Sequence, residues 1–280
     1  MELIYDIMDK LMPFEFMKYT FMKNSFLAIL IATPIFAILG TMVVNKKMAF
    51  FSDAIGHSAL CGIAVGTVFG FTDRSLSMVI FAVIFSMLLN YVKDRTTYGA
   101  DTIISVFASV AMSLGLVLLS AGGSFNKYTS YLVGDILSIT AQEIAFLAVC
   151  FVLVIVFWLL AYNKLSAASI NRTLAKSKGI NGLVLDYLYS AFIAVVIMFS
   201  IRWIGVLLIN SLIILPAASS RNISYNTRQY HLFSVLISLV PGIAGLIISY
   251  YTGTPTGPMI VLMLGAIFFV TFVIHSAVKK

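Results

Sequence analysis

The chain has 280 residues, of which 61% are hydrophobic and 10% are charged, and its mean hydropathy is +1.03. A chain this apolar cannot keep its surface away from water as a soluble domain, so we expect an all-α polytopic membrane protein with a single domain over residues 1–280. The formal net charge of +7 does not require nucleic acid as a partner, because excess Lys and Arg in a membrane protein belongs first to cytoplasmic loops. No soluble catalytic domain and no phosphate loop of the Gly-x4-Gly-Lys-Ser/Thr type is found, so the chain is not predicted to be an enzyme.

The first 20 residues are predicted to lie on the membrane surface. Leu3, Ile7 and Leu11 share one face of a short helix that Pro13 ends, and acidic residues lie on its other faces. Those acidic residues and the missing cleavage site argue against a signal peptide. Residues 1–20 are therefore interpreted as an interfacial segment in contact with membrane lipid.

Charge-free apolar stretches then predict nine spanning helices, each near the ~20 residues that a bilayer requires. The expected spans are 24–44, 50–70, 75–92, 101–120, 142–162, 183–201, 203–220, 230–251 and 258–278. Eight spans is the alternative, because 183–220 is weakly divided. With the N-terminus outside, 12 of the 18 basic residues fall in cytoplasmic segments, as the positive-inside bias requires.

The second predicted span carries two potential metal ligands in its first turns. Asp53 and His57 are four residues apart, so they share one helical face with Cβ atoms roughly 5–6 Å apart. Such a pair is costly in hydrocarbon unless it faces a partner or a wet cavity, which favours a transport pathway over mutual pairing near the interface. A second face has only small residues and invites close packing by another helix; its members are Ala54, Ser58, Gly62, Gly66 and Gly70.

The chemistry of this pair favours a transported cation and no permanently bound cofactor. A carboxylate oxygen and an imidazole nitrogen suit Mn²⁺, Zn²⁺ or Fe²⁺. Two or three protein ligands leave coordination positions open, which a transporter needs in order to release its ion.

Residues 121–139 are too mixed to span and predict a short or re-entrant helix. Asp135, next to Gly134, is placed near the outer mouth, where it either adds an oxygen to the pathway or only caps its helix. Thr140 and Glu143 form a capping-box pattern ahead of the fifth span. Asp186 is most simply explained as a partner of the helix dipole in the first turn of its span.

The segment 163–182 is the longest polar stretch in the body of the chain and is predicted to be a cytoplasmic loop with a short amphipathic helix. A transporter without its own nucleotide site must receive movement through such an element, so we expect this loop to dock on an ATPase. An ordinary basic loop near anionic lipid is the alternative. The candidate contact residues are Asn171, Leu174, Ala175 and Gly179.

Four phrases in order and in register carry a family resemblance. They are FSDAIGHSAL (51–60), YLVGDIL (131–137), SLIILPAA (211–218) and PTGPMIVL (255–262). The chain resembles the permease subunits of the zinc, manganese and iron ABC importers from about Leu27 to Val273. The resemblance implies a type II importer fold with two permease copies, two cytoplasmic ATPase subunits and an external metal-binding lipoprotein, in the cytoplasmic membrane of a bacterium.

The resemblance also implies that Asp53 and His57 are the metal-handling pair. The sequence departs from the family at Cys61, which replaces a common proline on the stripe of the pair, and at Asn210, where serine is more usual. Cys61 is interpreted either as a third, soft ligand or as an inert buried cysteine.

Three other functions stay open from the residues alone. An ABC permease for a siderophore-like or cobalamin-like chelate would share the helix count but would not need a carboxylate–imidazole pair. A secondary cation carrier would show an inverted repeat or several carboxylates in the middle of the membrane. A structural membrane subunit is the third alternative.

Overall fold

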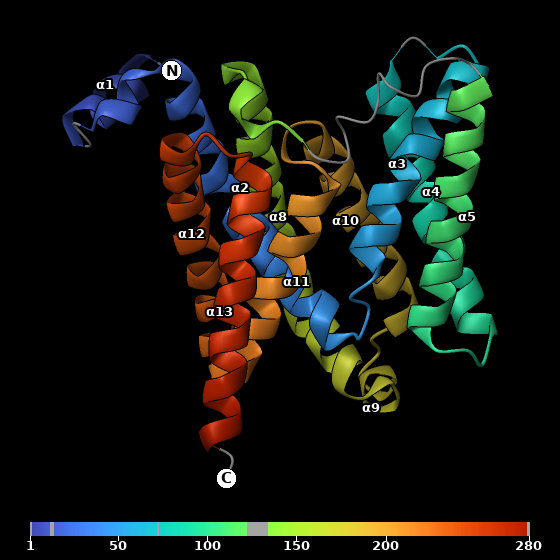
Figure 1. Cartoon of the computed structure of the whole chain (residues 1–280). Coiled ribbons are helices and arrows are strands. Elements are labelled where there is room, and N and C mark those ends of the chain that lie inside the picture. Colours follow the sequence, from blue (N-terminus) through green and yellow to red (C-terminus); the bar gives the residue numbers. More distant parts are fainter. Residues whose placement is uncertain (1, 12–13, 72, 122–133, 279–280) are drawn as a thin grey trace. The chain divides into compact units, whose positions relative to one another are not determined.

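The computed structural model describes residues 2–11, 14–71, 73–121 and 134–278, and within these the secondary structure is helical, without strands (Figure 1). Two single 3₁₀ turns, η1 (Glu15–Lys18) and η2 (Ile136–Ser138), accompany the α-helices. The α-helices are α1 (Glu2–Leu11), α2 (Thr20–Asn45), α3 (Phe51–Val68), α4 (Arg74–Arg95), α5 (Ala100–Ala121), α8 (Ala141–Ile170), α9 (Arg172–Ser177), α10 (Gly182–Ile204), α11 (Val206–Ile223), α12 (Thr227–Thr252) and α13 (Thr256–Val278).

Nine of the helices in the described part of the chain are long and apolar enough to cross a membrane. They are α2, α3, α4, α5, α8, α10, α11, α12 and α13, so the prediction of nine spans is confirmed against the alternative of eight. The weakly divided stretch 183–220 breaks at Gly205, whose φ of +80° lies in the left-handed region that glycine adopts without a steric penalty. This one residue separates α10 from α11.

The predicted end of the fifth span at about 162 is wrong, because α8 continues to Ile170. The polar residues that suggested a loop, including Asn163, Lys164 and Ser169, are exposed on the helix. Leu165 and Ala168 of the same stretch are buried. Within the predicted segment 163–182, the first eight residues therefore extend a spanning helix, and only the remainder contains the short helix α9.

The chain divides into two compact units that each combine separate stretches. Unit 1 contains Met1–Thr41, Val133–Val154 and Trp203–Lys280, and unit 2 contains Met42–Leu132 and Ile155–Arg202. The boundaries fall inside α2 and α8 and close to the end of α10. Because the same helices serve both units, neither unit is a segment of sequence that could be cut out, and the single permease domain over 1–280 stays a prediction.

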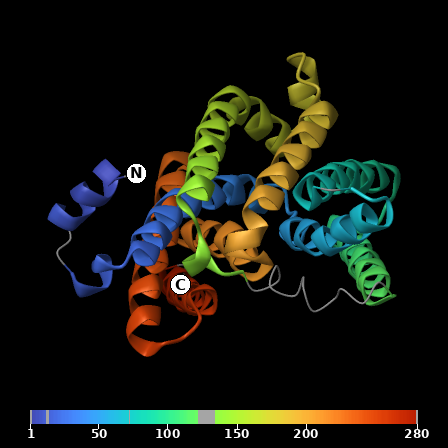
Figure 2. The same cartoon turned by 90° about the horizontal axis from the view of Figure 1, so that it is seen from above.

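In unit 1, α2 is joined to α12 by serine hydroxyls that donate to carbonyls of the neighbouring helix. Ser234 Oγ donates to Ala37 O at 3.2 Å, and Ser238 Oγ donates to Thr33 O at 3.1 Å. Helices α11, α12 and α13 lie beside one another in the same unit (Figure 2). Buried hydroxyls need such acceptors, since an unpaired polar group away from water costs about 1–3 kcal/mol.

The N-terminal segment begins with the predicted helix, α1, and continues through η1. Lys23 of α2 forms an ion pair with Asp9 of α1 at 2.6 Å, and Tyr5 Oη donates to Asn24 Oδ1 at 2.5 Å. Ile4 and Ile7 remain exposed on α1. Exposed apolar side chains on a helix tethered by polar contacts fit the predicted position at the membrane surface.

The capping box ahead of the fifth span is confirmed. Thr140 N donates to Glu143 Oε2 at 2.8 Å, and Glu143 N donates to Thr140 Oγ1 at 3.4 Å. The two residues thus satisfy each other's backbone donors at the start of α8. Of the stretch 121–139, Ala121 ends α5, residues 122–133 lie outside the described part, and residues 134–139 contain only the single turn η2.

In unit 2, α3 lies against α4 and α5, as both views show (Figures 1 and 2). A Cβ atom on Gly62 would lie 3.0 Å from the Cα of Met78 in α4, and one on Gly115 in α5 would lie 2.7 Å from the backbone N of Cys61. Ser77 Oγ fills the approach by donating to Gly62 O at 2.6 Å. The predicted close packing of the small-residue face is therefore confirmed at Gly62, and α5 adds a contact that depends on its own glycine. The prediction is wrong for Gly70, because α3 ends at Val68 and a Cβ atom on Gly70 would have nothing within 4 Å.

Candidate metal pathway and the ion-pair network around Asp186

Asp53 and His57 lie in the first two turns of α3 and face each other. His57 Nε2 is 3.4 Å from Asp53 Oδ1, and their side chains keep 24% and 39% of their surface exposed. His57 Nδ1 is buried and has no hydrogen-bond partner within the described residues. The pair is therefore half-open, with a carboxylate and an imidazole at one accessible place on an otherwise buried helix.

Cys61 continues the stripe of this pair one turn further along α3, but its side chain has only 2% of its surface exposed. Its backbone lies against Gly115 of α5, as described above. Among the residues that the structure describes, no three His, Cys, Asp or Glu side chains are gathered closely enough to hold a metal ion. The hypothesis that Cys61 is a third ligand stays a prediction.

Asp135 belongs to unit 1 and is the N-cap of η2. Its side chain accepts a hydrogen bond from Leu137 N at 3.2 Å, which is the capping role that the sequence offered as one of two interpretations. Gly134 before it has a φ of +75°, in the left-handed region that favours glycine. Asp135 lies in a cavity of about 90 Å³ that is also lined by Pro255 and Thr256. Its predicted part in the metal pathway stays a prediction.

The short helix expected in the polar segment is α9. Asn171 caps it, since its Oδ1 accepts from Thr173 N at 3.0 Å, and Ala175 is buried. Gly179, with a φ of +74°, ends the turn that follows. The side chain of Leu174 lies outside the described part. Beside α9 and the start of α10 is a hollow of about 570 Å³ lined by Arg172, Lys176, Gly179, Ile180, Asn181, Gly182 and Leu183.

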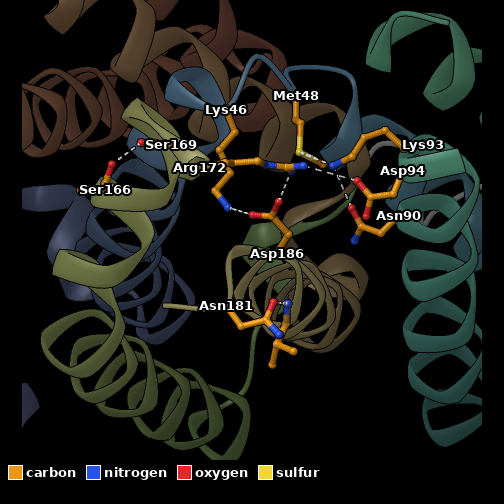
Figure 3. A network of polar contacts seen from close by, with 11 residues as sticks. Lys46, Met48, Asn90, Lys93, Asp94, Ser166, Ser169, Arg172, Asn181 and Asp186 are labelled. Atoms are coloured by element: carbon orange, nitrogen blue, oxygen red, sulfur yellow. Dashed lines mark hydrogen bonds and ion pairs between the residues drawn. The ribbon is translucent and has the colours of Figure 1, made fainter. Parts of the chain in front are cut away.

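Asp186 has a role that the sequence interpretation missed. The assignment as a dipole partner in the first turn is wrong, because Asp186 is the fifth residue of α10 and its buried carboxylate forms two ion pairs. One is with Lys46, just after α2, and the other is with Arg172 Nη2 of α9 at 2.5 Å. Figure 3 shows the Asp186 side chain between these two cations.

The network extends from Asp186 to the end of α4. Arg172 Nη1 is 3.7 Å from Asp94 Oδ1. Beside it, Lys93 Nζ donates to Asn90 Oδ1 at 3.0 Å and lies 3.6 Å from Met48 Sδ, in the connection between α2 and α3 (Figure 3). The network thus joins the ends of four elements, α2, α4, α9 and α10, by contacts that all lie in unit 2.

One signal in the sequence pointed to Asp186: an ionisable residue inside an apolar span is a functional candidate by default. Its partners could not be identified from the sequence, because Lys46 is 140 residues away and Arg172 is 14 residues away across a turn.

Comparison with known proteins identifies the family. The model of the ABC 3 transport family matches residues 18–275, which is most of the chain. The chain belongs to this family. It is therefore a multi-pass membrane protein of an ABC transport family, with the predicted all-helical permease fold.

The relatives of the chain in this family include zinc and manganese systems. The high-affinity zinc uptake system membrane protein ZnuB of Haemophilus influenzae is 28% identical over 83% of this chain and 89% of its own length. The manganese import system permease protein ScaB of Streptococcus parasanguinis is 24% identical over 99% of this chain and 97% of its own length. In structure, the chain is similar to PsaBC from Streptococcus pneumoniae in complex with Fab, with a TM-score of 0.79, 21% identity, and coverage of 97% of this chain and 95% of that chain. The structural similarity confirms the fold.

Proposed function

We propose that the chain is the membrane-spanning permease subunit of an ATP-driven importer of divalent transition-metal ions, with Mn²⁺ or Zn²⁺ as the cargo. The observation that carries the proposal is the half-open pair of Asp53 and His57 on a helix of an ABC 3 family member. Relatives of matching length are named for zinc and for manganese, so the cargo class is shared, while the pair itself suits both ions.

The pair acts as a transient site in this proposal. The Asp53 carboxylate supplies oxygen, and the half-buried imidazole of His57 supplies nitrogen through whichever ring atom carries no proton. Two protein ligands leave the remaining coordination positions for water, so the ion is held without being enclosed. The packing of α3 on α4 through Gly62 and Ser77 fixes the backbone that carries both ligands.

The test is metal uptake by intact cells that depend on the chain, with cellular Mn²⁺ and Zn²⁺ measured directly at limiting supply. Asp53→Ala and His57→Ala should insert normally and lose uptake, because a ligand change costs at least the 10–100-fold typical of second-shell changes. Asp101→Ala is the matched control, since Asp101 is an exposed carboxylate in the first turn of α5. Uptake by His57→Ala at the wild-type rate would show that the pair serves only in packing. If the variants lose uptake of a metal chelate and not of the free ion, the chelate permease is favoured.

We propose further that the chain works with partners: cytoplasmic ATPase subunits, an external metal-binding lipoprotein and a second copy of itself. The support is the absence of a phosphate loop in a member of an ABC transport family, together with the short helix α9. Helix α9 is capped by Asn171, anchored by the buried Ala175, ended at Gly179 and bordered by a hollow of about 570 Å³. These features make α9 a stable and accessible helix on which an ATPase can dock.

Docking is tested by co-purification of the chain with its ATPase. Leu174→Asp places a charge in the middle of α9 and should abolish complex formation while leaving the chain inserted in the membrane. Asn163→Asp is the matched control, because it adds the same carboxylate at an exposed position of α8. Normal complex formation by Leu174→Asp would contradict docking through α9.

A further inference from the structure

The ion-pair network around Asp186 connects the two elements that the proposed function needs to connect. On one side, Arg172 is the first residue of α9, the element proposed to receive movement from the ATPase. On the other side, Lys46 begins the short connection to α3, which starts at Phe51 and carries Asp53 in its first turn. Asp186 contacts both cations through different carboxylate oxygens, Oδ2 and Oδ1.

The two halves of this link differ in burial. Lys46 and Asp186 keep only 7% and 9% of their side-chain surfaces exposed, and the Lys46 ammonium also lies 5.3 Å from the ring centre of Tyr189, which follows Asp186 by three residues in α10. Arg172 keeps 55% of its side-chain surface exposed. Removing one partner of a buried pair is strongly unfavourable, whereas an exposed arginine separates at little cost. Lys46–Asp186 is therefore the fixed half, and Arg172–Asp186 is the half that can open.

Space for such movement is present beside the network. A cavity of about 320 Å³ is lined by Lys46, Met48, Lys93, Arg172 and Asp186, together with the last turn of α8. Arg172 can therefore change its contacts without first displacing packed side chains.

The connection between α2 and α3 is held at two points, and both lie in this network. Lys46 is held by Asp186, and Met48 contacts Lys93 near the end of α4. A shift of Asp186 would therefore displace Lys46 at the start of the stretch that leads into α3, while Met48 and the close packing of α3 on α4 limit where α3 can go.

We propose that Asp186 is a positioning residue that transmits movement of α9 to the start of α3, through Arg172 on one side and Lys46 on the other. This proposal rests on the proposed function and adds the physical route between its two sites. Asp186 does not contact the metal; it sets where the helix bearing Asp53 and His57 begins.

The test uses the complex of the full chain with its ATPase, reconstituted in proteoliposomes and supplied with the external metal-binding lipoprotein, with ATP hydrolysis and Mn²⁺ uptake measured in the same vesicles. Asp186→Asn and Arg172→Gln should lower the uptake per ATP hydrolysed by about 2- to 30-fold, the range for changes that weaken coupling between sites. Hydrolysis and complex assembly should persist. Lys164→Gln, which removes an exposed cation of α8 that is not part of the network, should leave the ratio unchanged.

Charge exchange separates transmission from simple stabilisation. Lys46→Asp combined with Asp186→Lys restores the buried pair but turns a cation toward Arg172, so this double variant should fold and stay uncoupled. Adding Arg172→Glu together with Asp94→Asn restores both pairs of position 186 without setting the new carboxylate against Asp94, and should restore the uptake per ATP.

The outcomes that overturn the proposal are distinct from failure of the proposed function. A wild-type ratio in both Asp186→Asn and Arg172→Gln, or full coupling in the double exchange alone, would show that the network only stabilises unit 2. If Asp186→Asn fails to assemble, the charge-exchange variants decide the matter. If the unaltered chain takes up no metal with its ATPase and the external lipoprotein, it is the proposed function that fails.

Discussion

Asp53 and Asp186 are two carboxylates in the same unit, each within the first turns of a spanning helix, and their surroundings are opposite. Asp53 keeps 39% of its side-chain surface exposed beside a histidine 3.4 Å away, whereas Asp186 keeps 9% and is held by two cations from other elements. A carboxylate with open surface and an imidazole nitrogen beside it can accept a cation from outside. A carboxylate that already forms an ion pair at each oxygen, as Asp186 does, cannot accept a further cation. Its role is to join the elements that carry its partners.

Removal of the buried carboxylate should have the largest effect on stability. Asp186→Ala leaves the Lys46 ammonium buried with no carboxylate against it, so the free energy of unfolding should fall by about 3–5 kcal/mol. Asp53→Ala, which opens only a half-exposed pair, should change it by no more than about 1 kcal/mol. Denaturant unfolding in detergent, followed by circular dichroism, measures both. Equal losses would mean that the two carboxylates hold the fold alike.

The second test concerns whether Asp53 and His57 act as one site. Each single alanine variant should reduce uptake by at least about 10–100-fold. The Asp53→Ala/His57→Ala double variant should take up metal no more slowly than the weaker single variant, because residues that act as a unit are not additive. The readout is initial uptake of Mn²⁺ at several concentrations. A double variant whose loss equals the product of the single losses would show two independent roles.

The smallest effect is expected at a third carboxylate, Asp73, which only caps a helix. Its side chain accepts from Ser75 N and Leu76 N at the start of α4. Asp73→Ala should lower the free energy of unfolding by about 1 kcal/mol, as loss of an N-cap does, and leave uptake unchanged. Asp73→Asn, which keeps an acceptor, should recover the stability. A clear loss of uptake in Asp73→Ala would remove the basis for ranking these three carboxylates by their surroundings.

The features that could be predicted from the sequence are local ones. The i,i+4 spacing of Asp53 and His57, the reciprocal cap of Thr140 and Glu143, and the small-residue face of α3 all follow from the period of a helix. The nine spans follow from length and hydropathy, because a membrane leaves little choice of secondary structure. These predictions hold without any knowledge of which helices are neighbours.

What could not be predicted depends on tertiary neighbours. Asp186 received its role from Lys46 and Arg172, which only the folded unit 2 brings to it. The polar residues of 163–170 indicated a loop, because composition alone does not reveal that Leu165 and Ala168 are buried in the folded chain. The role of Gly115 could not be predicted, because it depends on close contact with the backbone of Cys61 on a different helix.

One close contact between backbone segments in unit 1 restricts which substitutions this sequence can accept. Gly134 and Gly205 both have positive φ angles, and a Cβ atom on Gly134 would collide with the backbone of Ile204 and Gly205. The obstacle to a side chain at Gly134 is main chain, which every amino acid has, so no replacement of the opposite residue can make room for it. Gly134 therefore lacks the compensating substitutions by which most packed sites drift, and a saturation mutagenesis screen should find Gly134 intolerant in every genetic background.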